Sequence, residues 1–127
     1  MTENEISGAI VDAAYRVHRA LGPGLLESVY QAALGYELDQ RGLRVEREKA
    51  IPVIYEGIQF EIGFRLDLLV EDTVVVELKS IETVAPVHKK QLLTHLRLSN
   101  KPLGLLINFG AATIKDGVTR IVNGLRE

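Results

Sequence analysis

The chain contains 127 residues, of which 46% are hydrophobic and 25% charged; it has no cysteine, and its formal net charge is −2. These values fit a single domain over residues 1–127 and exclude a disulfide framework, a thiolate metal site and a cysteine nucleophile. The slight negative charge argues against a protein that coats nucleic acid. Because no apolar run approaches the length of a membrane span and the N-terminus is polar and acidic, we expect a cytoplasmic protein without a membrane partner.

Two helices are expected at the start of the chain. Over residues 6–21 apolar side chains recur every three or four positions, the period of a helix with one buried face. Thr2 and Glu5 have the spacing of a capping box, which would begin this helix. The sequence GPG at 22–24 ends it, and a second helix is expected over residues 25–41.

The hydrophobic period then changes to one that favours strands. Residues 43–57 alternate between apolar and polar side chains, and Pro52 indicates an edge strand or an irregularity there. One turn is expected at 56–59 and a second, acidic turn at 71–73. The remaining elements are a strand over 60–70, a strand over 74–79, a helix over 87–99 preceded by Pro86, a strand over 102–109 and a strand over 117–123. Residues 102–109 are nearly all apolar, which is typical of a strand buried on both faces.

This order of elements predicts an α/β fold in which a mixed sheet is flanked by helices. The strand over 74–79, the helix over 87–99 and the strand that follows together have the length of a right-handed βαβ crossover. Such a unit would make its two strands parallel to each other.

Three charged side chains interrupt the apolar hairpin DLLVEDTVVVELKS at 67–80. Glu77 and Lys79 lie on one face of their strand because side chains alternate. Asp67 joins that face if residues 71–73 form a three-residue loop, since this loop would pair it with Glu77. A two-residue loop would place Asp67 on the opposite face, so the arrangement depends on the register of the hairpin.

Two carboxylates that lie close together repel each other unless a proton or a cation lies between them. Mg²⁺ prefers oxygen ligands and keeps several waters, so Asp67, Glu77 and a backbone carbonyl would form a partial cage for it. A bound metal lowers the pKa of a water and polarises a phosphoryl oxygen, and Lys79 could orient that water, accept its proton or stabilise the phosphate. The pattern favours metal-assisted phosphodiester hydrolysis; a solvent-exposed hairpin with a Glu–Lys pair is the alternative.

Three separated segments carry a resemblance to a known family: GPGLLESVY at 22–30, GFRLDLLVEDTVVVELKS at 63–80 and PVHKKQLLTHLRLSNKPLGLLINF at 86–109. In this order they resemble the GxxExxY proteins, a family placed in the PD-(D/E)XK nuclease superfamily. The resemblance covers nearly the whole chain and implies a restriction-endonuclease-like core, a mixed β-sheet flanked by helices. It implies that Asp67 binds a metal, that Glu77 and Lys79 form the E-x-K pair, and that the cofactor is Mg²⁺, with Mn²⁺ as an alternative.

Other residues take expected roles from the same resemblance. Gly24, Glu27 and Tyr30 match the namesake motif. Glu27 resembles the acidic residue on the first core helix that binds or orients the metal; the alternative is a carboxylate favoured by the helix N-terminus alone. Tyr30 is expected to pack, with its hydroxyl bonded into the site. Gln91 resembles a site glutamine of exonuclease-like members, but His95 stands four positions on in place of Tyr, and a solvated helix face is an equal alternative.

Arg65 would share the face of Asp67, where it could pair with a carboxylate or contact a phosphate. A structural ion pair is the favoured role. Leu66 stands where the superfamily's name has Pro. His18 and His88 are expected to be packing or surface residues, since no two histidines have the spacing of metal ligands.

The combined interpretation is a metal-dependent nuclease that hydrolyses phosphodiester bonds, with DNA favoured over RNA. The expected catalytic residues are Asp67, Glu77, Lys79, Glu27 and Gln91, of which Asp67, Glu77 and Glu27 hold the metal, with Tyr30 and Arg65 in support. The alternative is a catalytically silent nuclease-fold module for nucleic-acid or protein interaction, because the sequence lacks the basic stripe of a strong nucleic-acid binder. A homo-oligomer could build a positive groove from two weak patches, with exposed sheet edges as the contact.

Overall fold

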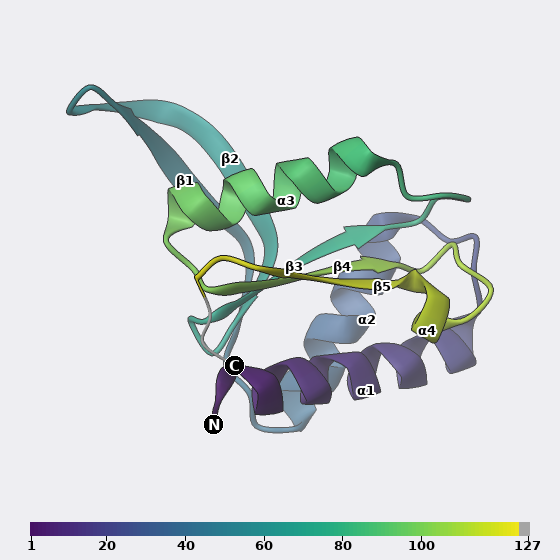
Figure 1. Ribbon diagram of the computed structural model, residues 1–127. Helices are drawn as coiled ribbons and strands as arrows, with labels where there is room; N and C mark the ends of the chain where they lie inside the picture. Colours follow the sequence, from purple (N-terminus) through teal and green to yellow (C-terminus); the bar gives the residue numbers. More distant parts are fainter. Residues whose placement is uncertain (125–127) are drawn as a thin grey trace.

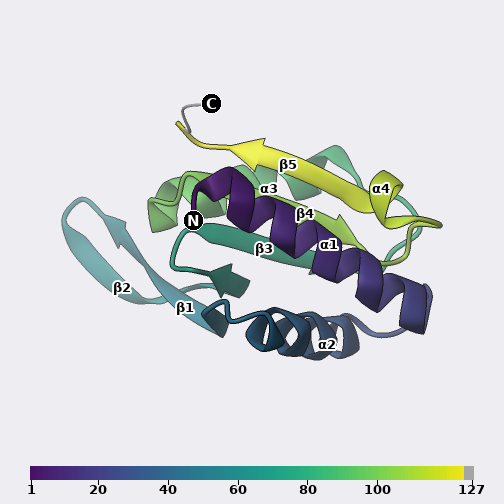
Figure 2. The same cartoon turned by 90° about the horizontal axis from the view of Figure 1, so that it is seen from below.

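The computed structural model describes residues 1–124, which form a five-stranded mixed sheet with helices on both faces (Figure 1). The elements are α1 (Glu3–Leu21), α2 (Glu27–Gln40), β1 (Val45–Tyr55), β2 (Ile58–Val70), β3 (Val74–Lys79), α3 (Pro86–Ser99), β4 (Leu103–Asn108), α4 (Ile114–Gly117) and β5 (Val118–Val122). Helices α1 and α2 lie on one face and α3 on the other (Figure 2). This architecture confirms the α/β fold expected from the order of elements.

Hydrogen bonds from neighbouring residues set where the first two helices begin. At the start of α1 the Glu5 N–H donates to the Thr2 hydroxyl, and the Thr2 N–H donates to the Glu5 carboxylate, each at 3.1 Å. The expected capping box is therefore confirmed. Helix α2 begins at Glu27, two residues later than expected, because the Leu25 N–H donates to the Tyr30 hydroxyl and residues 22–26 form a loop.

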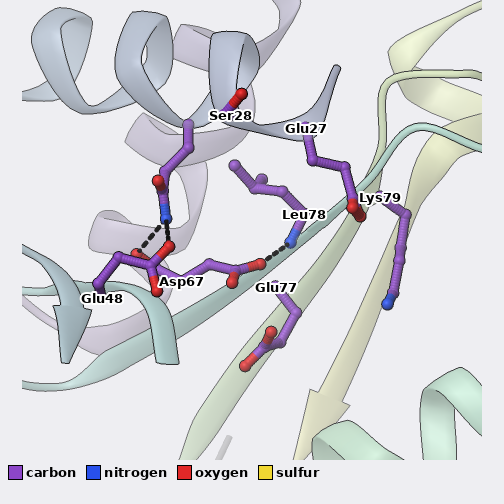
Figure 3. Close-up of a pocket in the computed structure, with 8 residues that line it drawn as sticks. Glu27, Ser28, Glu48, Asp67, Glu77, Leu78 and Lys79 are labelled. Carbon is purple, nitrogen blue, oxygen red and sulfur yellow. Dashed lines mark hydrogen bonds between the residues drawn. The ribbon is translucent and has the colours of Figure 1, made fainter. Parts of the chain in front are cut away.

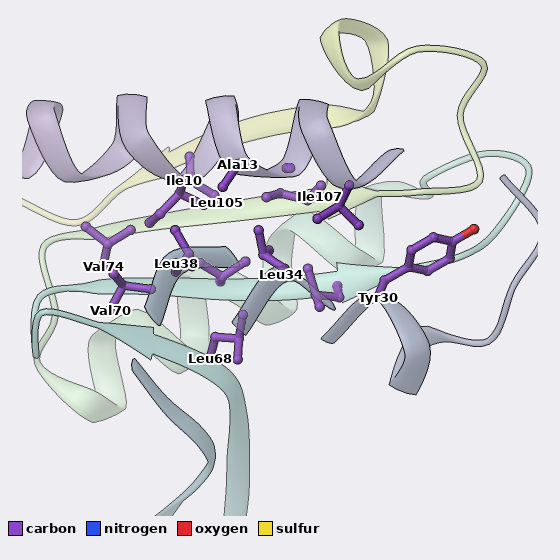
Figure 4. Close-up of a cluster of buried hydrophobic side chains, with 14 of the residues drawn as sticks. Ile10, Ala13, Tyr30, Leu34, Leu38, Leu68, Val70, Val74, Leu105 and Ile107 are labelled. Atoms are coloured by element: carbon purple, nitrogen blue, oxygen red, sulfur yellow. The ribbon is translucent and has the colours of Figure 1, made fainter. Parts of the chain in front are cut away.

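The core has two layers, one on each face of the sheet. Between the sheet and helices α1 and α2 lies the larger cluster, which includes Ile10, Ala13, Leu34, Leu38, Leu68, Val70, Val74, Leu105 and Ile107 (Figure 4). The smaller cluster packs under α3 and consists of Leu66, Leu69, Val75, Leu92, Leu96 and Leu106. Every residue of β4 is buried, as the nearly all-apolar sequence predicts.

The sheet order is β1-β2-β3-β4-β5 within the described residues. Strands β3 and β4 are parallel neighbours joined through α3, and the other neighbouring strands pair antiparallel. In the β2–β3 hairpin Val70 pairs with Val74, so residues 71–73 form the three-residue loop on which the site depends. The single turn of α4, over residues that carry no helical period, was not predicted.

The β1–β2 hairpin projects beyond the body of the sheet (Figure 1). Strand β2 pairs with β3 only as far as Leu68↔Val76, and its earlier residues pair with β1 alone. A bulge lies between Pro52 and Val53 on the edge strand β1, which confirms the irregularity expected at that proline. We call residues 50–64 the arm. In the described part of the chain no helix combines the length and the apolar composition that crossing a membrane requires.

Candidate active site

The site lies where β2 turns away from β3. The last pair of this ladder is Leu68↔Val76, and Asp67 and Glu77 are the next residues on the two strands. Here the Asp67 carboxylate accepts a hydrogen bond from the Leu78 N–H at 2.8 Å. The side chain of Asp67 thus takes the place of a strand carbonyl, and its position is fixed by the backbone of β3.

A cavity of about 280 Å³ opens at this point (Figure 3). Its lining comes from the start of α2, from β1, and from the parting ends of β2 and β3. The lining residues are Glu27, Ser28, Gln31, Glu48, Asp67, Glu77, Leu78 and Lys79. The register of the hairpin therefore brings Asp67, Glu77 and Lys79 to one cavity, as the three-residue loop requires.

The electrostatics of Asp67 are dominated by burial, which raises the pKa of its carboxyl above the ordinary value. The negative charge of Glu48 raises this pKa further. Hydrogen bonds from the Leu78 N–H and with Glu77, and the positive charge of Lys79, act in the opposite direction. Because burial and a like charge prevail, ionised Asp67 would be stabilised by a cation placed in the cavity.

Glu77 has the same character and a different neighbour. Burial is again the largest cause and raises the pKa of the Glu77 carboxyl, and the charge of Asp67 adds to the effect. Against this, His95 of α3 lies with Nδ1 3.3 Å from Glu77 Oε1. The His95 ring stacks on Phe64 of β2, with centroids 4.3 Å apart and planes 10° from parallel. His95, whose role the sequence left open, therefore holds one oxygen of Glu77.

Three further polar residues of the cavity, Ser28, Gln31 and Glu48, were missed from the sequence. The Gln31 amide donates to Glu48 Oε1 at 2.8 Å and to the Asp67 carbonyl at 3.0 Å. Glu48 has φ of 51°, in the left-handed region that a strand residue rarely adopts. Gln31 could have been found, since it stands one helical turn after Glu27 and so shares its face. No spacing in the sequence marks Glu48, because a local change of backbone conformation brings it to the cavity.

Glu27 and Lys79 both line the cavity (Figure 3). Glu27 is the first residue of α2, exposed, and placed by the loop that precedes it. The Ser80 hydroxyl, one residue after Lys79, donates to the Leu25 carbonyl of that loop. This bond ties the end of β3 to the segment that positions Glu27.

Tyr30 packs in the core as expected, but its hydroxyl bonds to other groups than expected. Its side chain is fully buried and stacks on Phe109, with centroids 4.4 Å apart and planes 7° from parallel. The hydroxyl donates to the Gly22 carbonyl and accepts from the Leu25 N–H, so it binds the loop before α2 and is not bonded into the cavity. Gly24, with φ of 100°, lies in the same loop. The matched glycine and tyrosine thus shape the loop that leads to Glu27.

Gln91 and Arg65 lie outside the cavity lining. Gln91 is exposed on α3, one helical turn before His95. Arg65 is exposed and lines a separate hollow at the base of the arm. Within residues 1–124 it forms no ion pair, contrary to expectation. The reason lies in the bend of β2: Leu66 packs under α3 whereas Leu68 packs under the opposite helices, so simple alternation does not hold across Asp67.

The remaining histidines are structural, as expected. His18 is buried, with Nε2 2.9 Å from the Ala111 carbonyl oxygen. His88 Nδ1 accepts a hydrogen bond from the Ala85 N–H at the start of α3.

The donor chemistry of the cavity suits a hard cation with few protein ligands. One carboxylate oxygen of Asp67 accepts from the Leu78 N–H, and one oxygen of Glu77 lies toward His95. The two carboxyl groups also share a hydrogen bond, and a cation between them could take the place of the shared proton. Over residues 1–124 no three His, Cys, Asp or Glu side chains are gathered closely enough to hold a metal, so Glu27 does not complete a three-ligand set. Mg²⁺ tolerates this, because it keeps several waters and needs only one or two carboxylates.

Comparison with known proteins agrees with the fold. The family model described as the PD-(D/E)XK nuclease superfamily matches residues 4–121, and the mixed sheet with flanking helices fits its restriction-endonuclease-like core. Searches of curated proteins and of solved structures returned no match. The match spans nearly all of the chain, and on this evidence the chain belongs to the PD-(D/E)XK nuclease superfamily.

Proposed function

We propose that this protein is a metal-dependent nuclease that hydrolyses phosphodiester bonds at the cavity lined by Asp67, Glu77 and Lys79. The observation that carries the proposal is the meeting of two half-buried carboxyl groups, both with raised pKa, and one amine in a single cavity. Groups with perturbed pKa values that meet in a cleft are candidates for a functional site. The family supplies the class of reaction, since it is a nuclease superfamily and implies a nucleic-acid substrate.

Nucleases of this superfamily generally depend on divalent metals. In our proposal Asp67 and Glu77 hold one Mg²⁺ or Mn²⁺ directly, and Glu27 reaches it through water. When bound, such an ion lowers the pKa of a water and polarises a phosphoryl oxygen. Its charge also removes the repulsion between the two carboxylates, which supports the choice of this pair.

The remaining polar groups act on position and charge. Lys79 orients the attacking water and stabilises negative charge on the phosphate. His95 holds Glu77 in place through its hydrogen bond, and Gln31 fixes Glu48 and the backbone at Asp67. Gln91, exposed beside His95 on α3, would meet the nucleic acid outside the cavity.

A cleavage assay tests the proposal. Purified protein is incubated with single- and double-stranded DNA and RNA in Mg²⁺, Mn²⁺ or EDTA; we propose DNA as the substrate. Wild type is compared with Asp67→Asn, Glu77→Gln and Lys79→Ala, and with Glu82→Gln, an exposed acidic control away from the cavity lining. Metal-dependent cleavage should be lost in the three site variants and kept in the control. Cleavage that persists in all three, or that needs no metal, would contradict the proposal.

A second function is favoured by one observation, the lack of a three-ligand metal cluster within residues 1–124. On this alternative the protein keeps the nuclease fold and binds nucleic acid or protein without turnover. Nucleic-acid binding that survives in the Lys79→Ala variant, with no cleavage by wild type in any metal, would support it over hydrolysis.

A further inference from the structure

The arm presents an apolar surface that the rest of the domain does not cover (Figure 1). Strand pairing places Val53 opposite Phe60, and Tyr55 opposite Ile58. These four side chains share one face of the ribbon, because directly opposed residues point the same way and residues two apart share a face. We call them the arm face. Tyr55 is 64% exposed, Ile58 61% and Phe60 46%.

A two-stranded ribbon with an uncovered apolar face is unusual on a protein surface. A two-stranded hairpin alone is marginally stable in water, and a contiguous exposed apolar face on a domain surface marks an interaction site. At the arm, β1 is an edge strand, and β2 before Leu68 has no strand on its other side within the described residues. The arm therefore has a free apolar face and two free edges.

The charge of the arm restricts what can cover it. Residues 50–64 contain Glu56 and Glu61 and neither lysine nor arginine. A nucleic-acid backbone needs positive charge from its partner, and the nearest cations, Lys49 and Arg65, stand only at the base of the arm. The chemistry of the face therefore fits a second apolar protein surface.

We propose that two copies of this chain associate through their arm faces, as a two-fold pair of stacked ribbons. Two-fold contacts join the same patch on both copies, so the arm face supplies both halves of the interface. Four side chains, three of them about half to two-thirds exposed, bury well under the about 800 Å² per partner of a standard interface, so the dimer is reversible and concentration-dependent. Strand β2 runs from this face directly to Asp67, so both cavities of the dimer lie at the roots of the joined arms.

The proposal does not depend on the nuclease activity, and sedimentation velocity over a wide concentration range tests it. Wild type should shift from monomer to dimer as concentration rises. Ile58→Glu on the arm face should remain monomeric, whereas Ile54→Glu, equally exposed at 63% but on the opposite face of the same ribbon, should dimerise like wild type. High salt should leave the dimer unchanged or strengthen it, because the charges at its rim are alike.

Chemical crosslinking provides a second test of the dimer. The chain has no cysteine, so Ile58→Cys introduces a single reporter on the arm face. A short bis-maleimide should then trap a covalent dimer from Ile58→Cys and little from Tyr36→Cys, an exposed position on α2. Wild type that stays monomeric at all concentrations, equal effects of Ile58→Glu and Ile54→Glu, or a dimer broken instead by Tyr36→Glu, would each overturn the proposal.

Discussion

Replacing Tyr30 with Phe removes the hydroxyl that holds the loop before α2 and keeps the ring that stacks on Phe109. Two hydrogen bonds are lost, one to the Gly22 carbonyl and one from the Leu25 N–H. Each is worth about 1 kcal/mol net, and water can reach part of this loop, so we expect the free energy of unfolding to fall by about 1–2 kcal/mol. For a domain of this size the melting temperature should fall by about 3–8 °C.

Urea denaturation followed by circular dichroism measures this change, with Tyr30→Leu as the matched comparison. The leucine variant also loses the aromatic stack, which adds about 0.5–1.5 kcal/mol, so it should be the less stable of the two. Glu27 begins the helix that this loop positions, so cleavage by Tyr30→Phe should be weakened but not lost. A Phe variant within about 0.5 kcal/mol of wild type, the range of a neutral surface change, would refute the role given to the hydroxyl.

Three further predictions concern the site and the arm. The Asn side chain of Asp67→Asn can still accept a hydrogen bond from the Leu78 N–H, whereas Asp67→Ala has no acceptor there. In urea denaturation with EDTA present, the alanine variant should therefore be less stable than the asparagine variant by about 1–3 kcal/mol. Equal stabilities of the two variants would contradict this. Burial raises the pKa of the Glu77 carboxyl above its ordinary value of 4.5, so the stability that this group contributes is present below that pH and is lost as pH rises through the folded pKa. The free energy of unfolding of metal-free Glu77→Gln should therefore rise relative to that of wild type from acid to neutral pH. A difference between the two proteins that does not change with pH would contradict this. A Cβ on Gly63 would overlap the Ile51 carbonyl, so Gly63→Ala should separate the two strands of the arm. The backbone amides of the arm should then exchange hydrogen faster than in wild type, and unchanged exchange would contradict the prediction.

Much of the fold could be predicted because local signals agreed with the final packing. The Thr2–Glu5 spacing became a capping box, and the acidic turn at 71–73 became the loop that sets the hairpin register. Pro52 marked the edge strand and its bulge. Each of these signals lies within a few residues of the structure it determines, so no long-range contact was needed to interpret it.

The parts that failed depend on contacts between distant segments. The Tyr30 hydroxyl was expected in the site, but the loop at 22–26 folds back over it. Arg65 was placed with Asp67 by strand alternation, which the bend of β2 breaks. Glu48 reaches the cavity through a left-handed backbone conformation and a bond to Gln31, neither of which has a periodic signature in the sequence.

The central claim is that Asp67 and Glu77 share one divalent cation. Calorimetric titration of metal-free protein with Mn²⁺ tests it directly, because the readout does not depend on substrate or turnover. Wild type and Glu82→Gln should bind one ion per chain with the same affinity, and Asp67→Asn and Glu77→Gln should each lose most of that binding. Undiminished binding in either site variant would contradict the account, as would the absence of binding in wild type.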